Sequence, residues 1–337
     1  KGGVVMIQAK SLDIPDAAYR KLKSMNASKL KIFANDKAQY YRQYVAKDIP
    51  TPPPTAAMSF GTLLHQVMES GGNWQDYVIE EPEELVGIKL PESVRKKGIE
   101  HFVDVPESVL SNGNRRGKKY LDFKKEADEA GKSLLPAGLT IEQCVKKANF
   151  LSEAGGREII KPGEFCLIRT CVENLMKNRW IRYVASLPSR CKEDTILWRH
   201  PASGILCKSR LDVISEEAGC IVDWKTTGSV NRRKLVRSMF DFNYPLSAAF
   251  YQQAVTQLLG GEVLPFYFVF IEKTGGCDFA IVEASEWLPH AHQLVDKLLL
   301  ELKNYDFSSI YKKKVETLPQ PRWASDAYAE QLQITSL

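Results

Sequence analysis

Long apolar runs and nucleotide-binding loops are both missing from this sequence. The longest obvious apolar run covers residues 265–271, whereas a bilayer span needs roughly 20 residues. No glycine-rich loop ends in Gly-Lys-Ser or Gly-Lys-Thr, the pattern that cradles nucleotide phosphates. The N-terminal residues also do not run from charged to apolar as a signal sequence does. We therefore expect a cytoplasmic protein with no membrane partner, no ATP cofactor and no built-in motor.

Cysteine is too sparse and too irregular for a disulfide scaffold. The chain has 7 cysteines among 337 residues, and they form no close-paired repeat. An odd number without pairing indicates reduced thiols. Hydrophobic residues make up 44% of the chain, which allows a full core. The length is typical of one elaborated domain or of two domains.

Net charge is also small, but its placement is uneven. The chain has 46 Lys and Arg against 41 Asp and Glu, a formal charge of +5, which does not by itself mark a nucleic-acid binder. Residues 111–125 carry six basic side chains and one acidic one, and residues 224–240 carry five basic side chains and no acidic one. Such runs are usually solvated faces, so their position relative to a functional site decides their meaning.

Helical and strand periodicities alternate along the chain and predict an α/β protein. Apolar residues first recur at helical spacing, and β-rich runs separated by Gly- or Pro-containing turns follow. This order predicts a mixed central sheet flanked by helices. The expected helices cover residues 28–44, 58–68, 165–185, 231–240, 246–259 and 285–302, and the expected strands cover residues 194–199, 204–214, 220–224, 265–273 and 279–283.

Three polar residues at the ends of two expected strands could carry chemistry. Asp212 and Asp223 lie near the ends of successive strands, and Lys225 follows two residues after Asp223. Residues two apart in a strand point to the same side, and an antiparallel neighbour could bring Asp212 to the same point. Two converging carboxylates repel each other unless a cation lies between them. Oxygen ligands favour Mg²⁺, with Mn²⁺ as the alternative.

The triplet from Asp223 to Lys225 is weak as a signal when it is taken alone. A carboxylate, any residue and then a lysine is a frequent pattern, and its simplest interpretation is an ion pair at a surface strand end. Apolar neighbours such as Leu211 and Val222 favour the other interpretation, because a carboxylate embedded in an apolar strand needs a partner. The preceding Asp212 and the basic helix that follows favour a site as well.

Several segments together resemble a known nuclease family. They are Gly61-Thr62-Leu63-Leu64-His65, the stretch from Gly204 to Asp212, the block Val222-Asp223-Trp224-Lys225-Thr226-Thr227 and the terminal stretch from Leu318 to Ala324. In this order they resemble the RecE-type exonucleases (exonuclease VIII) of prophage recombination systems, in the RecB-like branch of the PD-(D/E)xK superfamily. The resemblance implies a restriction-endonuclease-like core: one nuclease domain over residues 28–330, an N-terminal extension over residues 1–27 and a loop-rich helical insertion at about residues 71–160.

The resemblance also implies roles for individual residues. Asp212 and Asp223 match the metal-ligand carboxylates, and Lys225 matches the lysine that orients or activates the attacking water. His65 matches the additional metal-ligand histidine of the RecB-like branch. A lone histidine on a helix is more often a packed or exposed residue than a ligand, but the preceding Gly-Thr-Leu-Leu and the order relative to Asp212 favour a ligand here. The backbone carbonyl of Trp224 is a further expected ligand, and Glu193 matches an acidic position of the family more loosely.

One position departs from the family pattern. Members of the family resemble one another in a Gln-x-x-x-Tyr pair that contacts DNA. In this sequence Tyr251 matches the tyrosine, but Ser247 stands at the glutamine position. We expect Gln252 or Gln253 to replace the missing glutamine in part.

The basic runs gain meaning from the resemblance. The run after the expected metal strand would lie beside a bound duplex, where basic side chains contact phosphates without reading bases. We expect DNA contacts from Arg232, Arg233, Lys234 and Arg237, and from a second loop that carries Arg115, Arg116 and Lys118.

The resulting hypothesis is a Mg²⁺-dependent exodeoxyribonuclease that degrades double-stranded DNA from its ends and leaves single strands for recombination. The resemblance implies 5′ to 3′ polarity, a ring-like homo-oligomer and a single-strand annealing protein as partner. Some relatives hold an iron–sulfur cluster through cysteines near both ends of the chain, but no cysteine follows Cys277, so we expect none. The alternatives are a PD-(D/E)xK endonuclease of restriction or repair type and a DNA-binding module on the same fold that does not cleave.

Overall fold

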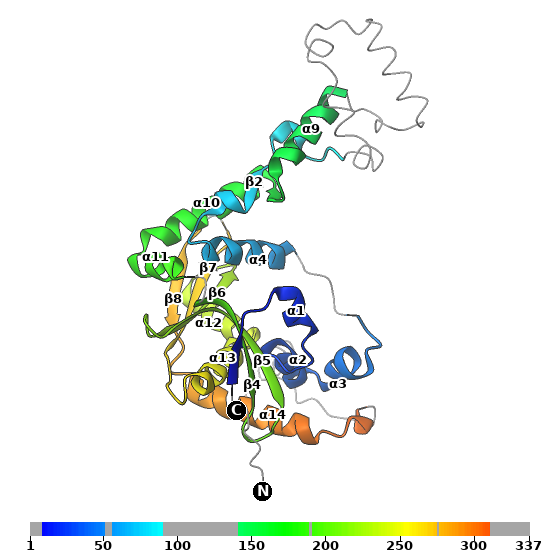
Figure 1. Cartoon of the computed structure of the whole chain (residues 1–337), viewed down its shortest axis with the longest axis vertical. Coiled ribbons are helices and arrows are strands. Elements are labelled where there is room, and N and C mark those ends of the chain that lie inside the picture. Colours follow the sequence, from blue (N-terminus) through cyan, green and yellow to red (C-terminus); the bar gives the residue numbers. More distant parts are fainter. Residues whose placement is uncertain (1–8, 51–55, 90–140, 189–190, 275, 311–337) are drawn as a thin grey trace, which may run out of the picture.

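The computed structural model describes residues 9–50, 56–89, 141–188, 191–274 and 276–310. These residues form a body around one large β-sheet and an arm that projects from it (Figure 1). Within these ranges, no helix is both long and apolar enough to cross a membrane. The predicted DNA-binding residues Arg115, Arg116 and Lys118 lie outside the described residues.

The body is built on a six-stranded mixed sheet with the spatial order β1-β4-β5-β6-β7-β8. Strands β6 and β7 are parallel, and the other neighbours are antiparallel. The predicted mixed sheet flanked by helices is therefore confirmed. The strands are β1 (Ala9–Leu12), β4 (Lys192–Arg199), β5 (Leu206–Ser215), β6 (Cys220–Thr227), β7 (Phe266–Glu272) and β8 (Phe279–Glu283). Because β1 pairs with β4, part of the segment expected as an N-terminal extension belongs to the sheet itself.

Helices cover both faces of the sheet, which explains the continuous apolar sequence of its central strands. Along β7, Phe266, Phe268 and Phe270 pack with one set of helices, whereas Val269 and Ile271 pack with the other. The first set comprises α2 (Ala27–Asn35), α12 (Arg232–Asp241), α13 (Tyr244–Leu258) and α14 (Leu288–Asn304), and the second comprises α4 (Ala56–Glu69), α10 (Pro162–Lys177) and α11 (Arg179–Ser186).

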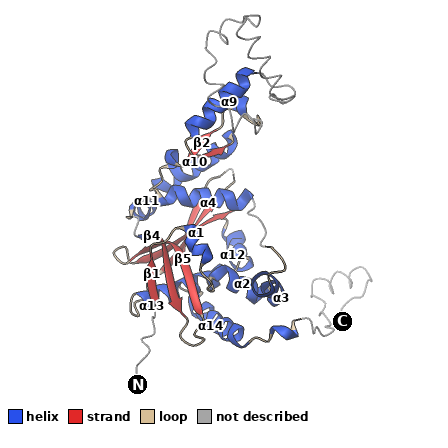
Figure 2. Ribbon diagram, turned by 45° about the vertical axis from the view of Figure 1, so that its right-hand side comes forward, coloured by secondary structure: helices blue, strands red, loops and turns tan. Residues whose placement is uncertain are grey.

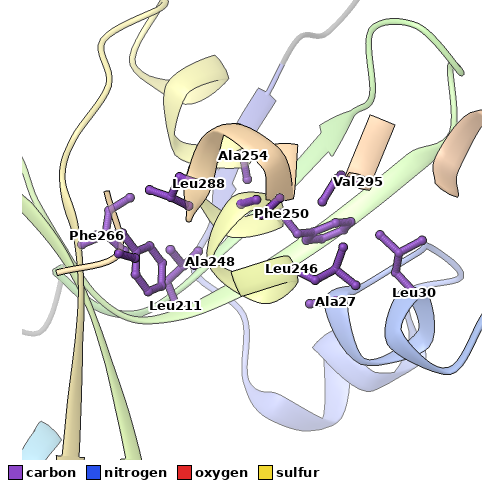
Figure 3. Close-up of a cluster of buried hydrophobic side chains, with 14 of the residues drawn as sticks. Ala27, Leu30, Leu211, Leu246, Ala248, Phe250, Ala254, Phe266, Leu288 and Val295 are labelled. Carbon is purple, nitrogen blue, oxygen red and sulfur yellow. The ribbon is translucent and has the colours of Figure 1, made fainter. Parts of the chain in front are cut away.

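Helix α13 forms the centre of the first hydrophobic layer. Its side chains Leu246, Phe250 and Ala254 lie between sheet residues such as Leu211 and the helices α2 and α14 (Figure 3). Phe250 is fully buried and packs edge-on against Trp198 of β4, with ring centroids 4.9 Å apart. This packing holds α13 in place, and α13 and α12 together form the crossover between the parallel strands β6 and β7.

Two helices expected as continuous are broken by capping residues. Asp36 separates α2 from α3 (Lys37–Tyr40) and the π-helical turn η1 (Tyr41–Ala46), and its side chain accepts from the Gln39 N–H. Asn178 separates α10 from α11, and its side chain accepts from the Ile181 N–H. The predictions of single helices over residues 28–44 and 165–185 were wrong here, because apolar periodicity continues across a residue that caps a new helix.

The arm has a small core of its own. It contains α9 (Ile141–Ala154), the parallel strands β2 (Val78–Glu80) and β3 (Glu158–Ile160), and the short helices η2 (Trp74–Asp76) and η3 (Glu83–Leu85). Leu85, Ile88 and Phe150 are buried together, next to an ion pair between Lys147 and Glu81. The remaining described helices are α1 (Asp16–Lys21) in the body and η5 (Phe307–Ser309) after α14.

Removing a buried ring from the body should cost far more stability than removing an exposed one. Phe250 is 0% exposed and Phe242 is 61% exposed. We expect Phe250→Ala to lower the free energy of unfolding by about 3–5 kcal/mol, and Phe242→Ala to change it by less than about 0.5 kcal/mol. Urea unfolding of both variants measures the difference, and equal losses would contradict the packing described for α13.

Candidate metal centre

Three carboxylates stand in one row across neighbouring strands. The pairs Lys192–Val213 and Asp194–Leu211 place Glu193 of β4 opposite Asp212 of β5. Continuing the β5–β6 register from the pair Val213–Val222 places Asp212 opposite Asp223 of β6. Residues that the sequence separates by as much as 30 positions thus meet at one end of the sheet.

The backbone is irregular where this row crosses the sheet. Glu193 has a left-handed backbone with φ of +51°, which is uncommon for a residue other than glycine. Leu211 and Val213, two residues apart, pack in different hydrophobic layers, so β5 reverses its faces at Asp212. The pairing of β5 with β6 stops at Val213, and the Trp224 N–H donates to Asp212 Oδ2 instead, at 2.7 Å.

Helix α4 brings His65 to the row. Both Figure 1 and Figure 2 show α4 lying across one end of the main sheet, between the sheet and the arm. Gly61 of α4 faces Thr226 of β6, where a Cβ would lie in ordinary contact, 3.4 Å from Thr226 Oγ1. One turn later on α4, His65 Nδ1 lies 3.5 Å from Asp212 Oδ1.

His65, Glu193 and Asp212 form a group that fits a divalent cation. Each offers one ligand atom, and these atoms all lie within 4.8 Å of one another. Ligand atoms on opposite sides of Mg²⁺ lie about 4.2 Å apart, so a small inward movement would bring all three atoms within bonding distance of one cation, with waters or further ligands filling its other positions. The two carboxylates are donors that Mn²⁺ and Mg²⁺ prefer, and the imidazole is a donor more typical of softer divalent transition metals.

Asp223 is engaged differently from the other carboxylates. Its side chain forms an ion pair with Lys225, and Lys225 Nζ also donates to the Trp224 carbonyl at 3.2 Å. The predicted ligands Asp223 and Trp224 therefore both contact the lysine in this structure. As metal ligands they stay predictions, because they would first have to release Lys225 in order to bind a cation.

The two aspartates have opposite electrostatic surroundings. Burial alone would raise the pKa of Asp212, but His65, Lys225 and the Trp224 N–H lower this pKa to about 2. Burial raises the pKa of Asp223 despite the nearby Lys225, and the charge of Asp212 adds to the rise. Unequal pKa values in adjoining carboxylates are what repulsion without an intervening cation produces.

The cationic partners respond to the same carboxylates. Burial works against a charged imidazole, but the Asp212 carboxylate outweighs it and raises the pKa of His65. Burial also works against a charged Lys225, but Asp223 and Asp212 raise the pKa of that ammonium. Lys225 therefore carries a positive charge beside the two carboxylates in this arrangement.

Two residues beside the row were missed by sequence reasoning. Glu69 lies one turn after His65 on α4, and burial together with the charge and hydrogen bond of Glu193 raises the pKa of Glu69 to about 8. Arg210 Nε lies 2.6 Å from Glu193 Oε2 and fixes that carboxylate from β5. The i to i+4 spacing from His65 was a signal for Glu69, whereas nothing local marked Arg210.

A second lysine, Lys31 of α2, also lies near the site and was missed. Lys31 Nζ lies 5.0 Å from the centre of the Tyr244 ring, and Lys225 Nζ lies 6.0 Å from the same ring. Burial, with the like charge of Lys225, lowers the pKa of Lys31 to about 8. Among the described residues, no carboxylate forms an ion pair with Lys31.

The expected DNA-contact residues that the structure describes lie in two situations, and Ser247, at the position of the family's glutamine, lies near one of them. Tyr251 is half-buried on α13 beside the carboxylate row, and burial raises its pKa well above the usual value. Ser247 is buried on the same helix. The basic side chains Arg232, Arg233, Lys234 and Arg237 are exposed on α12, which directly follows the metal strand β6.

The expected replacement of the missing glutamine was wrong. Gln252 donates to the Leu264 carbonyl and contacts His292, and Gln253 donates to Asp296 of α14. Both amides are used in packing α13 against its neighbours, because their positions on the helix turn them toward α14 and not toward the metal strands.

Comparison with protein-family models identifies a family for this chain. The family model for a "PDDEXK-like domain of unknown function (DUF3799)" matches residues 119–306, more than half of the chain. A crystal structure of a "Putative exonuclease" from Eubacterium rectale is similar, with 15% sequence identity and a TM-score of 0.49, over 94% of this chain and 99% of that chain. Comparison with curated proteins finds no match.

A divalent cation should stabilise the protein, and more so at higher pH. A cation at 100 times its dissociation constant adds about 2.7 kcal/mol of stability. Because Asp212 raises the pKa of His65 above the ordinary imidazole value, a proton competes with the cation as the pH falls through a range that begins above about 6.5. Thermal unfolding with Mn²⁺ should show a rise in Tm that shrinks over this range.

Variants locate the bound cation. We expect Asp212→Asn to abolish the Mn²⁺-dependent rise in Tm and His65→Ala to reduce both the rise and its pH dependence. The exposed Asp278, outside the row, supplies a matched control as Asp278→Asn, which should behave like the wild type. An unchanged rise in Asp212→Asn would place the cation elsewhere.

Proposed function

The chain belongs to the PDDEXK-like family DUF3799, and we propose that it is a Mg²⁺-dependent exodeoxyribonuclease that hydrolyses double-stranded DNA from its ends. The observation that carries the proposal is the row of Glu193, Asp212 and Asp223, with His65 and Lys225 beside it. A structural ion pair needs only one carboxylate and one cation. Three carboxylates that converge with an imidazole are instead suited to a metal ion.

The donor set defines what each residue would do. His65, Glu193 and Asp212 would hold the cation, with Asp223 and the Trp224 carbonyl as further ligands. A divalent cation bound there would polarise the phosphodiester and lower the pKa of the attacking water. Glu69 and Arg210 would position Glu193 by a hydrogen bond and an ion pair.

Lys225 would act through its positive charge. Its raised pKa keeps the ammonium protonated at neutral pH, so we assign it the orientation of water and the stabilisation of charge on the phosphoryl oxygens. Asp223 positions this ammonium at the end of β6. Proton transfer from the water would fall to another group.

Basic side chains near the site would bind the DNA backbone. Lys31 is partly buried without a carboxylate partner among the described residues, a state that a phosphate would relieve. The exposed basic side chains of α12 would extend these contacts away from the metal strand.

The finer parts of the proposal come from the RecE-type resemblance of the segments around Gly61, Asp212 and Asp223. They are the requirement for a DNA end, the 5′ to 3′ polarity, the supply of single strands for phage-type recombination, a ring-like homo-oligomer and a single-strand annealing partner. These stay predictions. An endonuclease of restriction or repair type is the second candidate, since the same residues would serve it.

Digestion of linear and closed circular duplex DNA with Mg²⁺ tests the proposal. We expect the wild type to degrade only the linear duplex, because an exonuclease needs an end. Lys225→Ala should lower the rate about 10²–10³-fold, as for the loss of a group that stabilises transition-state charge. As a control, Lys161→Ala removes an exposed lysine at the start of α10 that is not among the proposed site residues. This variant should leave the rate unchanged.

The other outcomes separate the alternatives. Cleavage of circular DNA would favour the endonuclease. With end-labelled linear DNA, release of the 3′ label before the 5′ label would indicate 3′ to 5′ digestion and contradict the predicted polarity. Folded wild type that binds Mn²⁺ but cleaves neither substrate would contradict the nuclease and favour the non-cleaving module.

A further inference from the structure

A basic cavity lies on the body, between α1, the α2–η1 segment, the start of β5 and the end of α14. Its volume is about 560 Å³, enough for a small organic anion. Figures 1 and 2 both show α1, α2 and α3 gathered on one side of the body. None of the residues proposed for the metal centre lines this cavity.

The lining is cationic and contains no carboxylate. Among the described residues, no acidic residue lines the cavity. Five basic side chains line it, namely Arg20, Lys21, Lys23, Lys29 and Lys47. Asp16 pairs with Arg20 from outside. Like charges at close range repel each other, so an anion bound among these side chains would be attracted by all of them, although Arg20, Lys21, Lys23 and Lys47 are also exposed to water.

The wall beside the lysines is held firmly to the sheet. Met25 pairs with β5, where its N–H donates to the Leu206 carbonyl at 2.9 Å and its carbonyl accepts from the Lys208 N–H at 2.7 Å. Lys208 Nζ also donates to the carbonyls of Tyr19 and Leu22, at 2.7 and 3.0 Å. The lysines at positions 21 and 23 therefore project from a fixed backbone.

The opposite wall has two locally unfavourable backbone features. The turn η1 is π-helical and ends at Lys47, whose backbone is left-handed with φ of 58°. π-Helical turns are rare and frequently occur at functional sites, and a left-handed lysine costs free energy. Tyr44 and Lys47, which belong to this segment, both line the cavity.

Polar groups suited to a ligand also lie at the cavity. Ser24 Oγ is buried and has no hydrogen-bond partner within the described residues, and a hydroxyl can donate to an anionic oxygen. Lys29 Nζ donates to the Ser24 carbonyl at 2.9 Å and lies 5.3 Å from the centre of the Tyr44 ring. Burial lowers the pKa of Lys29, so an anion near it would favour its charged form.

We propose that this cavity is a second anion site, which binds the phosphate of one nucleotide unit through its lysines and Ser24. A free nucleotide and a single strand of DNA carry the same phosphate chemistry. A duplex does not fit a cavity of about 560 Å³. The site goes beyond the proposed nuclease and holds whether or not the metal centre cleaves DNA.

Binding without cleavage tests the site. Titration calorimetry in the presence of EDTA measures the affinity of the protein for three ligands: dAMP, deoxyadenosine and a short oligothymidylate. We expect dAMP or the oligonucleotide to bind and deoxyadenosine not to bind. The charge reversals Lys23→Glu and Lys47→Glu together, and Lys29→Met alone, should each weaken binding at least about tenfold through loss of a charge-assisted hydrogen bond.

A matched control separates the cavity from net charge. Lys161→Glu and Lys177→Glu together make the same charge change at exposed positions of α10 and should leave the affinity unchanged. Thermal unfolding checks that each variant is folded. Weakened binding of dAMP assigns the site to free nucleotide, and weakened binding of the oligonucleotide alone assigns it to a strand.

Three results would overturn the proposal. They are the absence of binding by the folded wild type, equal binding of deoxyadenosine and dAMP, and equal losses in the cavity and control variants. None of them depends on DNA cleavage, so a failure of the nuclease proposal leaves the site unaffected.

Discussion

Repulsion among Glu193, Asp212 and Asp223 is the constraint around which this end of the molecule is organised. Each carboxylate has a different source of compensation: Arg210 for Glu193, His65 and the Trp224 N–H for Asp212, and Lys225 for Asp223. The compensation is unequal, because Asp212 is stabilised as an anion while burial raises the pKa of Asp223. A cation in the row would act on all of them at once.

The fold supplies this row by leaving a local irregularity in an otherwise regular sheet. The pairing of β5 with β6 stops at Val213, and Glu193 takes a left-handed backbone. Both faces of the sheet are covered beside it, by α4 on one side and by α13 and α2 on the other. Covering helices lower the effective dielectric constant around the carboxylates, which strengthens their interaction with any bound cation.

The sequence predicts the strands well and places Asp223 and Lys225 on one side of their strand, because both inferences depend on local patterns. Alternation and turn residues locate β4 to β6, and the Asp223 and Lys225 pair follows from strand geometry. The helix breaks at Asp36 and Asn178 are missed because apolar spacing continues through them. Lys31 and Arg210 are missed because only the tertiary fold brings them to the site. Strand β1 is too short to stand out before its partner β4 is known.

The location of a bound metal ion would show whether the carboxylate row is a metal centre. A crystal structure with Mn²⁺, in which anomalous scattering identifies the ion, should show density within about 2.2 Å of Asp212 and His65 atoms, a normal coordination distance. Asp223 should then have turned from Lys225 toward the ion. Density for Mn²⁺ only at other acidic residues, under conditions in which the protein cleaves DNA, would contradict the account.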